Sequence, residues 1–370
     1  MKIAIDCHTL EIKNWAGKEQ YLISILKEIA REDKANDYFL YFRRVVFKKD
    51  FFPSNWKVRT LNLPTPFWQL WVIFDLLIRK INILFAPCVY LLPALNFYTS
   101  NIIVIHDLTA FLNETKKTHK VLLKFKENLL VRRAIKNSTK IIAVSRHTKE
   151  DIIKLFGVNE TKIKVIGEAA QSRFRLIDER EKIIKILAEN NIPDKFILYV
   201  GTLEPRKNLI RLVKSYKEII DAGFNKYKLV LVGKRGWYYD EIFKKVKELN
   251  LENEVLFTGY LADGIIPYLY NAATCFVYPS FYEGFGLPVV EAMACGCPVI
   301  TSNISSLPEI AGNAAILINP YKKAELVEAF KKILIDNKLR SKMSARGLVQ
   351  AKKFSWGKTA KEIIDLYGNK

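Results

Sequence analysis

The stretch YPSFYEGFGLPVVEAMACGCPVITS (278–302) combines two acids with a glycine-rich turn. Glu283 directly precedes Gly284 and Gly286, and Glu291 follows eight residues later. The glycines would let the backbone approach a ligand, and the proline after them marks a helix start, where free amides attract a phosphate. Carboxylates repel phosphate oxygens but accept hydrogen bonds from hydroxyls. A ligand with phosphate between two polyhydroxylated rings, as in a nucleotide-sugar, would satisfy both features.

The two acids are assigned to opposite ends of such a ligand. Glu283 would bind the transferred sugar, and Glu291, in the first helical turn, would bind the ribose. A structural alternative is that Glu291 only complements the helix dipole and that the glycines only form a tight turn. A glycine-rich turn alone does not decide between these interpretations.

Alternating strands and helices would position this stretch. In the second half, short apolar runs alternate with amphipathic segments typical of helices. These runs are KFILYVG (195–201), KLVLVG (228–233), EVLFTG (254–259), TCFVYPS (274–280), PVITS (298–302) and AAILINP (314–320). The first half shows the same alternation, and its apolar runs are KIAID (2–6), INILFAP (81–87), NIIVIHD (101–107) and KIIAVS (140–145). This order predicts parallel sheets that bind ligands at the carboxyl ends of their strands.

The 370 residues suit two domains. A charged, pattern-poor run at 173–195 predicts the boundary between them. We therefore expect an α/β protein with an N-terminal domain over 1–175 and a C-terminal domain over 190–354. Both would be doubly wound parallel sheets, facing each other across a cleft.

Composition narrows the class of protein. The aromatic run at 66–80 is interrupted by Asp75, Arg79 and Lys80, so it predicts a buried helix, or one partly in a membrane surface, and not a transmembrane span. The chain starts directly with a strand-like run, so we expect no secretory signal. The cysteines have no metal-ligand spacing and are interpreted as small buried thiols of a reducing compartment. They are Cys7, Cys88, Cys275, Cys295 and Cys297.

Several motifs together resemble the retaining nucleotide-sugar glycosyltransferases of family 4, which have the GT-B fold. The Glu-x7-Glu pattern in EGFGLPVVE is the most specific of them. VGTLEPRKNL, LVGKRGW, VIHDLTAF and IIAVSRHTKEDI match further landmarks of that family, so the resemblance covers most of the chain. GTLEPRKN is most similar to bacterial mannosyltransferases of surface polysaccharide synthesis. In such proteins the final helix, here 355–370, returns to the N-terminal domain, and we expect Phe354 and Trp356 to anchor it.

The resemblance implies roles for individual residues. Arg206 and Lys207 would stabilise the leaving diphosphate, with Arg206 replacing an arginine that the family has where this chain has Thr202. His106 would contact the sugar or the leaving oxygen, and Glu283 completes the catalytic set. The donor-binding residues implied are Gly17, Gly201, Thr202, Gly284, Phe285, Gly286, Leu287 and Glu291. As structural alternatives, the cations would be solvated, His106 would only support the strand end, and Gly17 would belong to an ordinary turn.

The resemblance also implies retention without a covalent nucleophile. No Asp-x-Asp follows a predicted strand, so neither a metal nor another cofactor is expected beside the donor. GDP-mannose is the favoured donor, and UDP- or dTDP-sugars are alternatives. The acceptor would be a saccharide or a lipid-diphosphate-linked saccharide. A nucleotide-sugar epimerase of the same architecture and a non-catalytic binder remain as competing functions.

The net charge of +21 is concentrated in part at residues 116–140, where nine Lys and Arg stand against the single acid Glu127. Apolar residues recur there at helical spacing: Val121, Leu122, Phe125, Leu129, Leu130 and Val131. This basic amphipathic helix could contact anionic lipids or a lipid-linked acceptor, or it could face the core with a solvated basic side. Nucleic-acid binding is not expected, because aromatic residues are not interleaved with the basic run in the way that a stacking platform would need. We therefore expect a cytoplasmic protein, with peripheral contact to the inner membrane face as an option.

Overall fold

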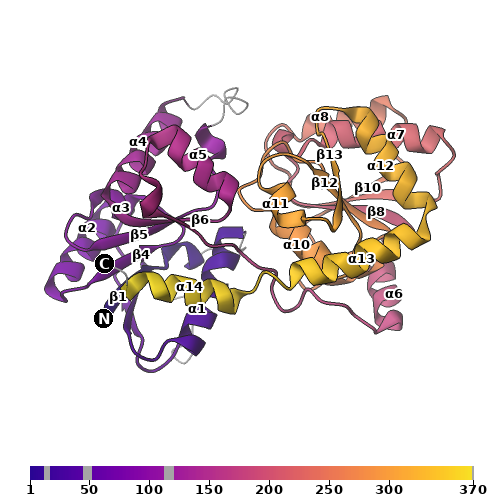
Figure 1. Cartoon of the computed structure of the whole chain (residues 1–370). Helices are drawn as coiled ribbons and strands as arrows, with labels where there is room; N and C mark the ends of the chain where they lie inside the picture. Colours follow the sequence, from indigo (N-terminus) through magenta and orange to yellow (C-terminus); the bar gives the residue numbers. More distant parts are fainter. Residues whose placement is uncertain (12–16, 45–51, 112–120, 369–370) are drawn as a thin grey trace. The chain divides into compact units, whose positions relative to one another are not determined.

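The computed structural model describes residues 1–11, 17–44, 52–111 and 121–368. The chain divides into two compact units (Figure 1). The first comprises Met1–Glu168 together with Trp356–Lys370, and the second comprises Ala169–Ser355. Each unit contains one parallel sheet with helices around it, so the predicted α/β class is confirmed.

The first unit contains a seven-stranded sheet in the order β3-β2-β1-β4-β5-β6-β7. Its strands are β1 (Lys2–Asp6), β2 (Asp37–Phe42), β3 (Lys57–Thr60), β4 (Ile83–Ala86), β5 (Ser100–Ile105), β6 (Ser138–Ala143) and β7 (Ile163–Val165). All pairs are parallel; Ile3 of β1, for example, is in register with Tyr38 of β2 and Ile83 of β4. The central strands are mostly buried, which explains why their sequences are mainly apolar.

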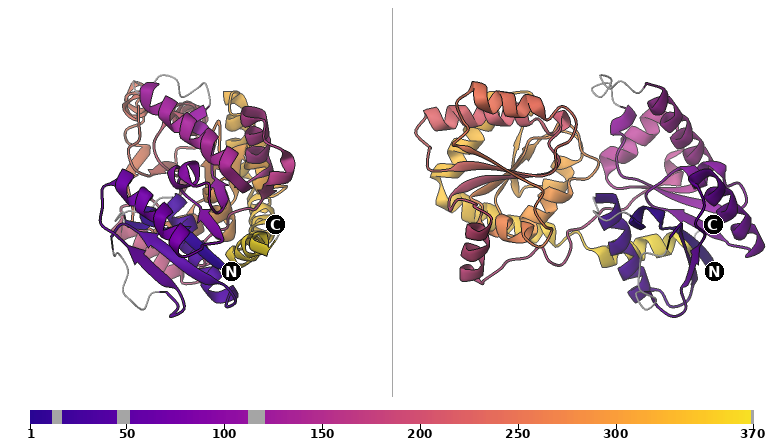
Figure 2. Two further views of the ribbon diagram at one scale, coloured as in Figure 1. Left: turned by 90° about the vertical axis from the view of Figure 1, so that its left-hand side faces the viewer. Right: turned by 180° about the vertical axis from the view of Figure 1, so that it is seen from behind.

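Helices cover both faces of this sheet. On one face lie α2 (Thr65–Ile78), α3 (Leu91–Leu95), α4 (Val121–Asn137) and α5 (Arg146–Phe156). Trp68 and Leu76 of α2 pack there against Leu84, whereas the neighbouring Phe85 points to the other face and contacts Tyr367. That second face carries α1 (Gly17–Glu32) and α14 (Trp356–Gly368), which lie side by side (Figures 1 and 2).

The second unit contains a six-stranded sheet in the order β10-β9-β8-β11-β12-β13. Its strands are β8 (Phe196–Val200), β9 (Lys228–Val232), β10 (Val255–Gly259), β11 (Cys275–Tyr278), β12 (Val299–Ser302) and β13 (Ala315–Ile318). Its helices are α6 (Arg180–Glu189), α7 (Leu209–Asp221), α8 (Asp240–Glu248), α9 (Ile266–Ala272), α10 (Leu287–Ala294), α11 (Leu307–Ala311), α12 (Lys323–Ile335) and α13 (Asn337–Ala351). All six strands were predicted from the sequence.

The chain passes between the units at two places. The first is at Glu168 and Ala169, upstream of the predicted boundary run 173–195. Much of that run forms α6, which belongs to the second unit because Leu187 is buried and the helix packs against α9. At the second place, Phe354 makes an edge-to-face contact with Phe285 of the second unit, and Trp356 makes one with Tyr21 of the first.

The aromatic run at 66–80 forms α2, and only one of its faces is buried. Trp68 is fully buried and donates its indole N–H to the carbonyl of Phe42, whereas Phe67 and Phe74 are 61% and 62% exposed. Among the described residues, no helix combines the length and the apolar character needed to cross a bilayer. All five cysteines are buried and unpaired.

Candidate functional site

Both sheets have a point where the strand order reverses. In the second unit the chain runs from β8 through β9 to β10 on one side, and continues from β11 to β13 on the other. The reversal lies between β8 and β11, where parallel sheets leave a crevice for ligands at the carboxyl ends. The loop after β8 contains the predicted Gly201, Thr202, Arg206 and Lys207, and the loop after β11 contains the predicted residues 283–286. The topology thus brings the two predicted motifs together.

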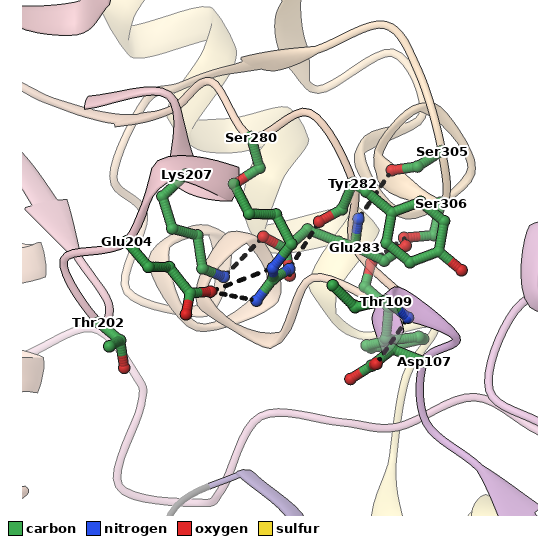
Figure 3. A network of polar contacts seen from close by, with 12 residues as sticks. Asp107, Thr109, Thr202, Glu204, Lys207, Ser280, Tyr282, Glu283, Ser305 and Ser306 are labelled. Atoms are coloured by element: carbon green, nitrogen blue, oxygen red, sulfur yellow. Dashed lines mark hydrogen bonds and ion pairs between the residues drawn. The ribbon is translucent and has the colours of Figure 1, made fainter. Parts of the chain in front are cut away.

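Glu283, Lys207 and Arg206 form one network in these loops. Glu283 and Lys207 are buried (Figure 3), and Arg206 is half-buried. Oε1 of Glu283 lies 2.6 Å from Nζ of Lys207, and Oε2 lies 2.8 Å from Nη1 of Arg206. Lys207 also donates to the hydroxyl of Tyr278 at 2.5 Å and lies over the ring of that residue. Both carboxylate oxygens are therefore held by charge-assisted hydrogen bonds.

The network fixes the charge of its members. Burial by itself would raise the pKa of Glu283, but the positive charges of Lys207 and Arg206 outweigh it and lower that pKa to about 2. Burial, together with repulsion from Arg206, lowers the pKa of Lys207, and attraction by Glu283 opposes this shift. Burial raises the pKa of Tyr278 well above its ordinary value, so its hydroxyl stays protonated. Glu283 is thus a firmly ionised carboxylate and a weak base.

Glu204 holds Arg206 from the opposite side. Its Oε1 accepts from Nε of Arg206 at 3.1 Å and from Nη2 at 2.7 Å. Arg206 additionally donates to the carbonyl of Tyr282 at 2.6 Å. Within the described part of the chain, these contacts use four of the five guanidinium N–H donors, and Lys207 uses two of its three. Among the described residues, these contacts leave one N–H of each cation unused.

The loop after β8 lies directly against the loop after β9. The N–H of Leu203 donates to the carbonyl of Lys234, and that of Gly236 donates back to Leu203. A Cβ atom on Gly233 would lie 1.9 Å from the carbonyl oxygen of Gly201, so glycine is required at position 233. Thr202 is exposed and lies apart from the acidic and basic side chains of the network (Figure 3).

Serines and a threonine hold the loop after β11. Oγ of Ser305 accepts from the N–H of Glu283, and Oγ of Ser306 lies 2.7 Å from the carbonyl oxygen of Phe285. Ser302 of β12 donates to the carbonyl of Ser280 in the loop, and Thr301 donates to the carbonyl of Tyr278 at the end of β11. The backbone around Glu283 is thereby fixed from the neighbouring strand, which preorganises the carboxylate.

The glycine-rich turn ends at the start of α10. Gly286 is the N-cap with φ of 112°, a conformation that favours glycine, and Leu287 begins the helix. Gly284 and Phe285 are buried in the same turn. Glu291 is the fifth helical residue and half-buried, so it lies beyond the first turn in which the sequence placed it. The difference arises because the helix starts immediately after Gly286.

His106 lies at the carboxyl end of β5 in the first unit, as predicted, and is buried. Its Nδ1 lies 2.8 Å from Oε1 of Glu168, and its Nε2 lies 2.8 Å from the carbonyl oxygen of Pro87. A carbonyl only accepts, so Nε2 must carry a proton. Both ring nitrogens thus have protein partners, as expected if His106 only supports the end of the strand. A sugar-contacting role for His106 stays a prediction.

Gly17 is the first residue of α1 and not part of the preceding loop. A Cβ atom there would meet nothing within 4 Å, so no close approach of protein backbone requires glycine. Residues 12–16, which precede it, lie outside the described residues. The predicted contact of Gly17 with a diphosphate therefore stays a prediction.

The described half of the basic segment 116–140 packs against the first sheet. Val131, Ala134 and Ile135 of α4 are buried in its core, whereas Leu129 is 58% exposed. Residues 116–120 and the side chains of Val121, Leu122 and Phe125 lie outside the described residues. The described residues contain no group of three His, Cys, Asp or Glu side chains arranged to hold a metal ion.

Sequence reasoning missed four contributors to this site. Tyr278, Ser305 and Ser306 act through contacts between segments that are distant in sequence, and Glu204 acts through Arg206 within its own loop. Glu204 was within the GTLEPRKN motif, and its position two residues before Arg206 was a usable signal. The serines gave none, because Ser-Ser before Leu-Pro equally suits an ordinary helix start.

Two family matches cover more than four fifths of the chain. Residues 21–169 match the family described as Glycosyltransferase Family 4, and residues 179–349 match the family described as Glycosyl transferases group 1. The first match lies in the first unit but for its last residue, and the second lies in the second unit.

Two curated relatives from Escherichia coli share part of their length with this chain. O-antigen chain mannosyltransferase B is 37% identical over 228 residues, which are 61% of this chain and 60% of that protein. The serotype-specific mannosyltransferase WbdA is 32% identical over 278 residues, 74% of this chain and 34% of WbdA. The chain thus spans less than two thirds of the length of these relatives.

Solved structures share the fold across the whole chain. Anabaena HepE, in complex with UDP and glucose, superposes with a TM-score of 0.79 at 19% identity, covering 99% of each chain. The family resemblance and the fold class predicted from the sequence are confirmed. The chain belongs to the family 4 glycosyltransferases and has the GT-B fold.

Proposed function

We propose that the protein is a retaining, metal-independent glycosyltransferase of cell-surface polysaccharide synthesis. It moves a hexose, with mannose from GDP-mannose as the favoured donor, to a saccharide or lipid-linked saccharide acceptor. Family membership and the two relatives named as mannosyltransferases support the reaction class and the sugar. The single observation that carries the proposal is the fixed carboxylate of Glu283 beside two cations at the point where the strand order reverses.

The chemistry of the site suits a nucleotide-sugar. The start of α10 offers the N–H of Leu287, which has no intrahelical acceptor, and the positive end of the helix dipole. Arg206 and Lys207 add positive charge whose interaction with a leaving diphosphate grows as the glycosidic bond breaks. Their charges are balanced by Glu204 and Glu283, so the protein holds them in place before the donor binds.

The state of Glu283 argues for a binding role. A carboxylate with both oxygens in charge-assisted hydrogen bonds, and with its pKa lowered to about 2, is a poor nucleophile and a poor base. Its remaining lone pairs can still accept hydrogen bonds from sugar hydroxyls. This supports transfer without a covalent glycosyl-enzyme intermediate at Glu283, with the departing phosphate oxygen taking the proton of the acceptor.

The nucleotide base of the donor is the part of the proposal with the least support, since HepE, which shares the fold, was solved in complex with UDP. A thermal-shift panel of GDP-mannose, UDP-glucose and a dTDP-sugar tests it, because a ligand at 100 times its Kd stabilises the folded chain by about 2.7 kcal/mol. We expect GDP-mannose to give the largest shift. A larger shift with a UDP- or dTDP-sugar would replace the donor and leave the reaction class standing.

The reaction class is tested by incubating the chain with the donor that binds and an oligomannose acceptor, and by analysing products by mass spectrometry. Transfer predicts an acceptor that is heavier by one hexose. An altered donor sugar without any elongated acceptor would instead identify an epimerase. Donor binding with neither product, over a panel of oligosaccharide and lipid-linked acceptors, would overturn the proposal in favour of a binding protein.

A further inference from the structure

The outer face of α2 is an apolar stripe that no described part of the chain covers. Its members are Phe67, Leu70, Phe74, Leu77 and Ile78, with exposed fractions of 61, 59, 62, 42 and 62%. At about 100° per residue these five fall on one stripe roughly 100° wide. The opposite face, with Trp68, Val72 and Leu76, is fully buried against the sheet. The stripe therefore is not needed to hold α2 in place.

The stripe continues across the neighbouring helices. α2 contacts α3, and Phe97 and Tyr98, which follow α3, are 61% and 65% exposed. The guanidinium of Arg133 on α4 lies 5.6 Å from the centre of the Phe97 ring. Leu129 of α4 is exposed as well, and α4 contacts α3, so α2, the residues after α3 and α4 each carry exposed apolar side chains.

Positive charge borders this surface on α4. Arg132, Arg133 and Lys136 are all exposed, and none forms an ion pair with a residue that the structure describes. Arg132 and Lys136, with Lys162, line a cavity of about 390 Å³ between α4 and the end of α5. Such a cavity suits the phosphate of a lipid headgroup.

The sequence of this region is correspondingly poor in acids. Between residues 52 and 149 there are fifteen Lys and Arg against four Asp and Glu, a net +11 of the chain's +21. The single acid on α2, Asp75, is buried and neutralised by Arg59 and Arg79. A large apolar surface beside unbalanced cations is complementary to a bilayer with anionic headgroups.

We infer that this surface, formed by α2, the residues after α3 and the outer side of α4, docks on an anionic lipid bilayer. The apolar side chains of α2 enter the boundary between headgroups and acyl chains, and the α4 cations contact lipid phosphates. A second copy of the chain suits this face less well, because two such surfaces would bring like charges together. The inference concerns attachment and is independent of the proposed transfer reaction.

Vesicle co-sedimentation of the full chain tests it. The vesicles contain either phosphatidylcholine alone or phosphatidylcholine with phosphatidylglycerol. We expect binding to the anionic vesicles only, weakened by added salt as charges become screened. No binding to the anionic vesicles, or equal binding to both kinds, would overturn the inference.

Two variants separate the contributions. Phe67→Ser/Leu70→Ser/Phe74→Ser removes apolar contacts, and Arg132→Gln/Arg133→Gln/Lys136→Gln removes charge. We expect each to weaken binding at least tenfold. The matched control, Ile335→Ser/Val349→Ser, removes two side chains that are 68% and 65% exposed in the second unit and should bind as the parent does.

Circular dichroism checks that the variants fold. If the serine variant does not fold, the charge variant alone still tests the inference. Binding at the parental level by either folded variant would overturn the inference. Light scattering addresses the other occupant of the face. A parental dimer that the serine variant converts to a monomer would show that a second copy covers α2, and would also overturn it.

Discussion

Nζ of Lys207 lies 2.6 Å from Oε1 of Glu283 in a buried ion pair, although 76 positions separate the two residues in the sequence. The pair joins the loops after β8 and β11, the two strands at which the order of the sheet reverses. Arg206 closes the arrangement by binding the second oxygen of Glu283. The cations and the acid, which the sequence assigned to different parts of a ligand, hold one another in place.

Removing both members of this pair should cost less stability than the two single removals added together. Lys207→Met leaves the negative charge of Glu283 with only Arg206 as a counter-ion, and Glu283→Gln leaves the buried Lys207 without one. Each variant should lower the free energy of unfolding by about 3 kcal/mol. The double variant should lose less than the sum of the two. Urea unfolding of all four proteins measures the coupling. The control is Lys217→Met, which breaks an exposed pair with Asp221 and should change stability by less than about 1 kcal/mol. Additive losses would contradict the pairing.

Acid should weaken the fold through Glu283. Its pKa is about 2 in the folded chain against an ordinary value of 4.5, so the unfolded chain binds more protons between these values. The stabilisation is complete above pH 4.5 and is lost as the pH falls toward 2, with a total of about 3 kcal/mol. Urea unfolding near pH 6 and near pH 3 should show a smaller acid loss for Glu283→Gln than for the parent. Equal losses would mean that Glu283 is not held as an ion.

Arg206 should not be replaceable by lysine. Its guanidinium binds Glu204 through two nitrogens and Glu283 through a third, and a single ammonium group cannot span both acids. We expect Arg206→Lys to lower kcat/KM for transfer at least tenfold, about 1.4 kcal/mol of transition-state stabilisation.

Glu204 acts through Arg206 as a positioning residue. Glu204→Gln should raise KM for the donor more than it lowers kcat, and Glu204→Asp should restore part of the affinity. Parental kinetics for both Arg206→Lys and Glu204→Gln would remove Arg206 from the site. Control substitution of Arg211, whose guanidinium binds the carbonyl of Pro320 instead, tests whether any nearby arginine has the same effect.

Chelation should leave transfer unaffected. The proposed site carries its positive charge on Arg206 and Lys207, which can stabilise a departing diphosphate without a metal ion. Rates measured with and without an excess of EDTA should agree within about twofold. A loss of activity that added Mg²⁺ or Mn²⁺ restores would contradict the proposal of a metal-free reaction.

The strands were predictable because burial on both faces leaves them as short apolar runs, such as KFILYVG, which contains β8. The boundary was harder to place. Residues 180–189 have too many charges to stand out as a helix, and yet α6 forms because Leu187 reaches the core and the rest stays solvated. Amphipathic helices with a narrow buried face leave little signal in a sequence.

The residue types of the site were predictable, but their partners were not. Sequence patterns show where the strands end, and ligands bind at the carboxyl ends of parallel strands. The glycine-rich turn and the cations after β8 could therefore be identified as site residues. Which cation pairs with which acid depends on how the loops after β8 and β11 pack against each other. One such contact is the hydrogen bond from the N–H of Phe281 to the carbonyl of Arg206. Similarly, nothing in VIHDLTAF shows that Glu168 lies 2.8 Å from His106.

Gly233 should be as important for the site as the charged residues. An added Cβ would lie 1.9 Å from the carbonyl oxygen of Gly201, and it would push away the loop that carries Arg206 and Lys207. Gly233→Ala should therefore lower the free energy of unfolding by about 2 kcal/mol or more and reduce transfer as well. The matched control is Gly264→Ala, since a Cβ at position 264 meets nothing within 4 Å and should change stability by less than about 0.5 kcal/mol. Thermal unfolding of both variants measures the difference, and equal stabilities would show that the two strand ends do not pack as closely as described.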